Sequence, residues 1–447
     1  MANTSVTKKA EFSRLIYENT LWRGLLLLSS LLLNILVARY YQAAASGWIF
    51  FVFSYYTLFI EVLGFSMESG ISYYASRNEV TASRLLCLSL LLSLAAVVPV
   101  VIFFRLYLPE PLRGLSPAFV LFSAISFISG YILNNCCSAL FYAHKKFILP
   151  NVLSIAINGV LILFLLFAGG GRVWATGSDP FIILLFASFA AQGLVMLVAG
   201  IMTLGGGQPF SLPGVAGLKK IGRYSLQAFI ANTVFFMLYR IDYWFVEKYC
   251  RPEILGNYIQ VSKLVQLFLL FPGFIAGAVF PLTAGGWKDE VNKNLRGITA
   301  GLLVLYSIIC ALLALTGYWL FPFLFGSSFD KMYQPFLLLI PGILSLSMLS
   351  PFSAYYAGRN RVRVNIIGAL LSLVLIVTGD VLFIPRYGIH AAALVSSVGY
   401  IAYLVYVIRV YKKEYGIATG ALFSISRSEL YWIRDMIIGN VFKKKHP

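Results

Sequence analysis

Five charged side chains lie inside long apolar runs of this 447-residue chain, where a charge is costly. They are Glu61 and Glu68 in one run, Arg240 and Asp242 in a second, and Lys263 in a third. A charge at the centre of a bilayer costs about 2.5–3.5 kcal/mol on insertion scales, so it faces a wet cavity or a partner of opposite charge. The five residues therefore predict either a polar space inside an apolar bundle or ion pairs that hold its helices together.

The spacing of the polar residues in 48–70 favours the cavity. Small and polar side chains recur there in steps of three and four, which places them on one face of a helix. This face consists of Ser54, Thr57, Glu61, Gly64, Glu68 and Ser72. A looser stripe further along the chain consists of Asn257, Gln260, Lys263 and Gln266.

Ion pairing is the alternative for Glu61 with Lys263 and for Arg240 with Asp242. Arg240 and Asp242 lie about 200° apart around a helix, so at least one of them needs another partner. The Glu68 carboxylate is equally compatible with a position at the inner membrane interface. We expect Asp380 at the opposite interface, because it lies near the end of its apolar run.

The composition is that of a polytopic membrane protein. Hydrophobic residues make up 60% of the chain and charged residues 12%, about half the charged fraction of a soluble domain. The three His are scattered and the five Cys contain no C-x-x-C, so we expect no metal site, no disulfide and no catalytic cluster. We expect an all-α integral membrane protein that is not an enzyme.

About twelve apolar runs are long enough to span a bilayer. They lie near 21–38, 48–70, 85–107, 117–142, 147–168, 180–204, 224–246, 258–283, 298–321, 335–357, 363–384 and 389–410. Most Lys and Arg fall in alternate connections and in the tail, which predicts that both termini are cytoplasmic. This bias also accounts for most of the net charge of +18 without nucleic acid. We divide the chain into a six-helix bundle at 1–204, a linker at 205–223, a second six-helix bundle at 224–411 and a basic cytoplasmic tail at 412–447.

The stretch VARYYQAAASGW at 37–48 has two interpretations, a leader cleavage site or a turn between two helices. The apolar run before it is longer than the 7–15 residues of a signal h-region. The stretch also recurs 209 residues later as VEKYCRPEILGNY, and FYAHKKFILPN recurs at a shift of 214 as YYAGRNRVRVN. We therefore expect a turn, and two pseudo-symmetric halves with the substrate site between them.

The repeat pairs the run at 21–38 with 224–246 and the run at 48–70 with 258–283. The four runs would line one polar space, to which Arg23 and Asn34 also contribute. Pro272 interrupts one run, so Pro272, Gly273 and the related Gly64 are hinge candidates, with static kinks as the alternative.

Four stretches of the chain resemble the Wzx-like polysaccharide flippases of the multidrug/oligosaccharidyl-lipid/polysaccharide (MOP) exporter superfamily. They are LNILVARYYQAAASGWIFFVFSYYTLFIEVLGFSMESGISYYASR, YRIDYWFVEKYCRPEILGNYIQVSKL, FPFLFGSSF and FIPRYGIHAAALVSSVGY. The likeness runs from about 20 to 410. One departure is Ala391, where the family usually has Gly.

The resemblance implies two MATE/MOP-like bundles around a cavity with a lateral opening for a lipid tail. It implies that an undecaprenyl-pyrophosphate-linked oligosaccharide moves from the inner to the outer leaflet of the bacterial cytoplasmic membrane, for O-antigen, capsule or exopolysaccharide assembly. The expected cavity lining consists of Arg240, Lys263, Arg23, Asp242, Gln260 and Asn34. We expect no cofactor beyond possible H⁺ or Na⁺ coupling, for which Glu61 and Glu68 are the candidates.

Three rival functions stay open. A drug or cation exporter of the same superfamily would have the same fold, and a glycan polymerase or ligase would need a sizeable outer loop with catalytic residues. A lipid II flippase usually has fourteen helices. The expected partners are the lipid-linked oligosaccharide, membrane lipid and other polysaccharide-assembly proteins, with the chain acting as a monomer. The tail at 428–445 is expected to be either an amphipathic surface helix or a solvated segment.

Overall fold

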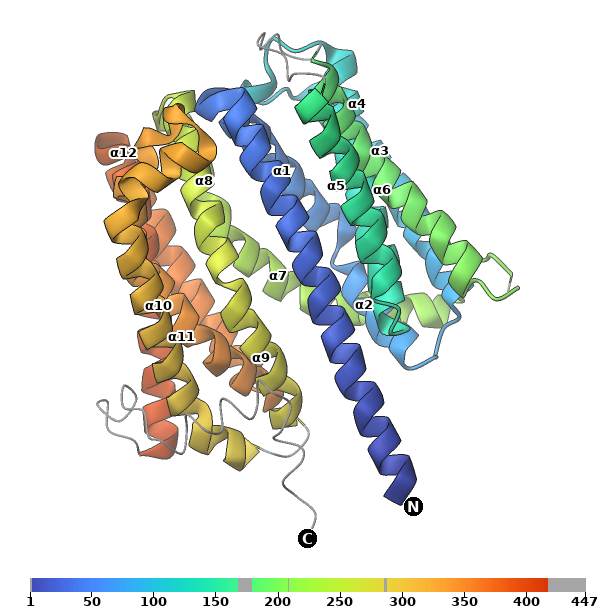
Figure 1. Cartoon of the computed structure of the whole chain (residues 1–447). Helices are drawn as coiled ribbons and strands as arrows, with labels where there is room; N and C mark the ends of the chain where they lie inside the picture. The colour runs from blue at the N-terminus through green and yellow to red at the C-terminus, as the bar shows by residue number, and fades with distance from the viewer. Residues whose placement is uncertain (1, 168–178, 208, 285–287, 417–447) are drawn as a thin grey trace. The chain divides into compact units, whose positions relative to one another are not determined.

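The computed structural model describes residues 2–167, 179–207, 209–284 and 288–416. In these residues all regular secondary structure is helical (Figure 1). Nine helical segments in this part of the chain are long and apolar enough to cross a membrane. The chain divides into two compact units, Met1–Thr233 and Val234–Pro447. The expected tail helix at 428–445 lies outside the described residues.

The first unit contains six long or short α-helices and the beginning of a seventh. They are α1 (Ala2–Gly64), α2 (Met67–Ser76), α3 (Ala82–Leu106), α4 (Pro117–Ala143), α5 (Ile148–Phe167), α6 (Pro180–Leu204) and the start of α7 (Val215–Tyr249). The helix α1 is two helices that meet at Gln42, where the backbone is non-helical (φ 58°, ψ 178°). This break falls inside the stretch 37–48. The residues 215–223, which the sequence assigns to the linker, form the first turns of α7.

Local sequence explains where α4 and α6 begin. Pro117 and Pro180 occupy the first helical positions, where a missing N–H costs nothing. The Ser116 hydroxyl accepts a hydrogen bond from the Phe119 N–H (3.2 Å), and the Asp179 carboxylate accepts from Phe181 N–H (2.8 Å). Asp179 also accepts a hydrogen bond from the buried hydroxyl of Tyr41 (2.9 Å). The N-terminus of α6 is therefore fastened to α1.

Small residues allow α4 and α6 to pack with their backbones in contact. A Cβ atom on Gly130 would collide with the main chain of Phe189 and Ala190, and one on Gly193 would lie 2.6 Å from the Gly130 carbonyl oxygen. Such small-residue contacts drive helix association where there is no water to expel. Beside this contact Phe53 stacks on Phe127 with ring centroids 4.9 Å apart.

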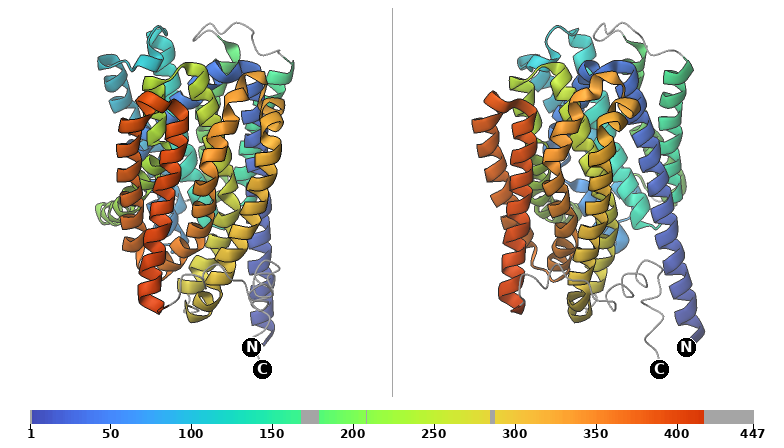
Figure 2. Two further views of the ribbon diagram at one scale, coloured as in Figure 1. Left: turned by 90° about the vertical axis from the view of Figure 1, so that its left-hand side faces the viewer. Right: turned by 60° about the vertical axis from the view of Figure 1, so that its left-hand side comes forward.

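The second unit continues α7 and adds five helices and one short 3₁₀ helix. They are α8 (Pro252–Phe268), α9 (Leu270–Leu282), α10 (Lys288–Phe325), η3 (Ser327–Met332), α11 (Tyr333–Gly358) and α12 (Val362–Tyr415). The helix α12 consists of two limbs, 362–387 and 389–415, joined at Gly388 (φ 56°, ψ −138°). The limbs run antiparallel and side by side (Figure 2). Glycine suits this junction because its positive φ carries no Cβ penalty.

Candidate functional site

The second unit buries a carboxylate, Asp242 of α7, whose two oxygens have different surroundings. Its side chain is 3% exposed. One oxygen, Oδ2, accepts hydrogen bonds from the Tyr258 hydroxyl of α8 and from the Ser396 hydroxyl of α12 (3.3 Å). The other oxygen, Oδ1, is buried with no hydrogen-bond donor among the described residues. A buried carboxylate oxygen without a donor is costly, so a proton or a cation bound here would stabilise the site.

A second carboxylate, Asp380 of the first limb of α12, lies close enough to Asp242 for their charges to interact. It is 0% exposed, and within the described part of the chain neither of its oxygens has a hydrogen-bond partner. The sequence places Asp380 near the membrane interface, and the structure adds that its side chain is buried and faces Asp242. Its place along the run says how deep it lies, whereas the packing of α12 decides which way it faces.

A small cavity opens beside Asp242. Its volume is about 10 Å³, roughly the space that one water molecule requires. Tyr239, Tyr258, Ser262, Gln266, Ser396 and Tyr400 are among the residues around it. Oxygen atoms from a carboxylate and several hydroxyls form a ligand set for a hard cation or a site for a proton.

The predicted cations Arg240 and Lys263 are brought together in the same unit. They lie on α7 and α8, both half-buried, and their charges interact. The Arg240 guanidinium also lies 5.9 Å from the centroid of the Phe236 ring. Gln260 is buried on α8, three residues before Lys263. Pro272 and Gly273 lie in the first turn of α9.

In the first unit the structure brings Glu61, Gly64 and Glu68 to one cavity of about 40 Å³. Ser66, Asn135 and Cys136 are among the other residues that line it. The expected continuous helical face is wrong, because α1 ends at Gly64 and α2 begins at Met67. Phe65 and Ser66 between them have left-handed backbone (φ 50° and 47°). The Ser69 hydroxyl donates a hydrogen bond to Glu68 Oε1 (3.3 Å).

Arg23 and Asn34 do not line this cavity. The exposed Arg23 guanidinium lies over the Tyr142 ring, 4.4 Å from its centroid. The Tyr142 hydroxyl in turn donates a hydrogen bond to Asn151 Oδ1 (3.2 Å). Asn34 is half-buried on α1.

Nearly the whole chain superposes on solved structures of transporters. A lipid II flippase, MurJ, in an inward closed conformation superposes with a TM-score of 0.64 at 14% sequence identity, covering 96% of this chain and 94% of the flippase. An inward-facing multidrug resistance transporter of the MATE family superposes with a TM-score of 0.66 at 14% identity, covering 87% and 94%. A MOP-superfamily transporter from Pyrococcus furiosus gives 0.60 at 15% identity, covering 92% and 97%.

The chain therefore shares the fold of these solved structures. No protein-family model and no curated protein matches the sequence. With nine apolar helical segments among the described residues, it is a multi-pass membrane protein.

Sequence reasoning missed Asp380, Tyr258 and Ser396. The first had a clear signal, because Asp380 is the only acidic residue in the apolar run 363–384. The cost that singled out Asp242 applies equally to it. Tyr258 and Ser396 had no such signal in the sequence, since tyrosine and serine are common throughout the chain.

Proposed function

We propose that this chain is a transporter that crosses the membrane twelve times, as two six-helix halves with cytoplasmic termini. The breaks at Gln42 and Gly388 each divide one long apolar segment in two. The helix α7 has 35 residues, or about 52 Å at 1.5 Å per residue, and a bilayer core is about 30 Å thick. It supplies one more crossing despite its polar side chains. The proposal includes the boundaries of these parts: the first half ends at 204, the linker ends at 223 and the second half ends at 411.

The proposed substrate is an undecaprenyl-pyrophosphate-linked oligosaccharide, carried from the inner to the outer leaflet of the bacterial cytoplasmic membrane for surface polysaccharide assembly. The observation that carries this substrate class is that Arg240 and Lys263 lie close enough for their charges to interact. Two positive charges in one half-buried place attract an anionic group, and the low local dielectric strengthens that attraction. A pyrophosphate is such a group. The lipid II flippase among the structural neighbours supports a lipid-linked cargo.

The proposed coupling site is the carboxylate pair of Asp242 and Asp380. A bound H⁺ or Na⁺ would neutralise charge in a place where two buried carboxylates otherwise repel. The Glu61–Glu68 cavity in the first unit is the second proposed site. Occupation and release of these sites would favour different states of an alternating-access cycle.

Charge reversal tests the substrate assignment. Arg240→Glu and Lys263→Glu should each block glycan export and leave the amount of protein in the membrane unchanged. Lys248→Glu is the matched control, because it reverses an exposed charge in the last turn of the same α7. In a deletion strain, mass spectrometry of the lipid extract should identify the lipid-linked glycan that accumulates inside. Normal export by both cavity variants would refute the assignment.

A cation-coupled exporter of small cationic molecules is the second candidate. The four carboxylates Asp242, Asp380, Glu61 and Glu68 favour it, since a cationic cargo requires acidic groups. The same deletion strain separates the two functions. A strain that retains drug cations and accumulates no lipid-linked glycan supports the exporter.

A further inference from the structure

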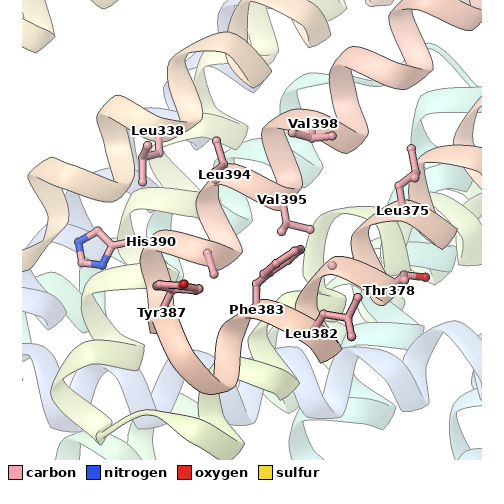
Figure 3. A pocket seen from close by; sticks show the side chains of 12 residues that line it. Leu338, Leu375, Thr378, Leu382, Phe383, Tyr387, His390, Leu394, Val395 and Val398 are labelled. Carbon is pink, nitrogen blue, oxygen red and sulfur yellow. The ribbon is translucent and has the colours of Figure 1, made fainter.

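An apolar groove of about 630 Å³ lies along the two limbs of α12. In Figure 3 the side chains of Phe383 and Leu382 on one limb and of Leu394 and Val395 on the other surround the space between them. Leu338 of α11 adds to the lining. Leu382 is 59% exposed and Leu394 51% exposed. The groove therefore opens to the surroundings of the helices and is not part of the core.

The groove has the length of one leaflet. Its lining runs from Leu375 to Tyr387 on the first limb, which is about 18 Å at 1.5 Å per residue. Half of a bilayer core is about 15 Å thick. A single hydrocarbon chain of an ordinary bilayer lipid therefore matches its length. The tail of a cargo that has to reach both leaflets has no such match.

Apart from the Thr378 hydroxyl, the polar side chains of the groove gather at the end where the limbs join. His390 Nε2 donates a hydrogen bond to Gln334 Oε1 (2.7 Å). Tyr387 and His390 both line this end of the groove (Figure 3). This bond brings the start of α11 next to the junction of the limbs. The exposed charged residues nearest this end in the sequence are Arg386 on the first limb and Asp330 and Lys331 in η3, directly before α11. Since two cations outnumber one carboxylate, this end favours an anionic head group.

The groove and the buried carboxylate pair lie on opposite sides of the same two turns of α12. Gly379 and Val395 line it, and a Cβ on Gly379 would lie 2.6 Å from a Val395 methyl carbon. The next residue on each limb, Asp380 and Ser396 respectively, belongs to the buried site around Asp242. A chain lying in the groove therefore presses on the two turns that position that site.

We propose that this groove binds one hydrocarbon chain of an anionic phospholipid from the leaflet around the Gly388 end, with the phosphate near Arg386 and His390. Phosphatidylglycerol has this chemistry. The site is separate from the cargo cavity, and the proposal does not depend on which substrate the transporter carries. Binding would brace the two limbs of α12 against each other and so stabilise the folded protein.

Photo-crosslinking in nanodiscs tests the proposal. The probes are phosphatidylglycerol and phosphatidylcholine with a photoreactive group in one acyl chain, and the labelled peptides are mapped. We expect labelling concentrated on 375–398, with the anionic probe favoured about fivefold or more, since one surface cation is worth about that factor. Labelling spread evenly over all exposed helices would overturn the proposal.

Two variants sharpen the test. Leu394→Trp fills the groove and should reduce labelling several-fold, whereas Val381→Trp, on the exposed face of the same α12 outside the groove, should not. Arg386→Gln should remove the preference for the anionic probe and keep labelling by phosphatidylcholine. The unfolding temperatures of both Trp variants are measured to check that they are folded. Equal labelling of the two Trp variants, or loss of label to equimolar unlabelled polyprenyl phosphate, would overturn the proposed occupant.

Discussion

The hydroxyl of Tyr306 on α10 donates a hydrogen bond to the carbonyl oxygen of Phe268, the last residue of α8. This carbonyl is four residues before Pro272, which has no N–H to donate to it. The hydroxyl thus replaces the bond that the proline removes. The break between α8 and α9 is therefore a supported feature of the second unit, made by Pro272 and stabilised from a different helix.

Tyr306→Phe should destabilise the protein. It removes only an oxygen atom, and a buried carbonyl that loses its partner costs about 1–3 kcal/mol. The unfolding temperature in detergent measures the loss. Tyr318→Phe is the matched control on the same α10, because Tyr318 is 61% exposed. If both variants unfold at the wild-type temperature, the carbonyl of Phe268 does not depend on Tyr306.

The contact between α4 and α6 gives a second stability prediction. Gly130→Ala places a methyl group against the main chain of Phe189, which cannot move aside as a side chain can. Overpacking of this kind costs about 1–3 kcal/mol. Gly159→Ala on α5 is the control, since nothing lies within 4 Å of its new Cβ. Removing a helical glycine in open space should raise stability by up to about 1 kcal/mol.

The test is whether the two substitutions change the unfolding temperature in opposite directions. Thermal unfolding should place Gly130→Ala below the wild type and Gly159→Ala at or above it. A Gly130→Ala protein as stable as Gly159→Ala would mean that α4 and α6 are not packed backbone to backbone.

The extent of the helices could be read from the sequence where apolarity and start signals coincide. The run expected at 117–142 is α4, Pro117–Ala143, because Ser116 and Pro117 mark its start. The run expected at 224–246 begins nine residues earlier as α7, because Lys219, Lys220 and Arg223 are good helix formers that an apolarity criterion excludes. Composition thus finds membrane segments better than it finds helix ends.

The site was harder to predict, for a different reason. The position of a residue along an apolar run indicates how deep it lies in the membrane. It does not indicate which side of the helix packs against other helices, so the sequence gives the depth of Asp380 and not its neighbours. The break after Gly64 is also hidden, since Phe65 and Ser66 are not residues that usually adopt left-handed backbone. Even so, Glu61 and Glu68 reach one cavity, because the turn between α1 and α2 is short enough to keep them close.

Asp179 should be important for stability although it lies far along the sequence from its partner, Tyr41. Asp179→Ala removes the cap of α6, a loss of about 0.5–2 kcal/mol, and leaves the buried Tyr41 hydroxyl without its acceptor. Tyr41→Phe removes only the second contact, so it should cost less. Ser116→Ala, which removes the cap of α4 alone, is the control for the capping contribution. Unfolding temperatures in the order Ser116→Ala above Asp179→Ala check the prediction, and the reverse order contradicts it.

The two carboxylate pairs can be tested against each other through cation-dependent stability. A cation that binds only the folded protein stabilises it by about 2.7 kcal/mol at a concentration one hundred times its Kd. If the Asp242–Asp380 pair binds Na⁺, the unfolding temperature of the wild type should be higher in NaCl than in N-methylglucamine chloride at equal ionic strength. Asp380→Asn should remove most of this difference, because the amide carries no charge for a cation to neutralise. Glu61→Gln and Glu68→Gln are the matched controls and should keep the difference. A Na⁺ effect that survives in Asp380→Asn and disappears in Glu61→Gln would move the coupling site to the first unit.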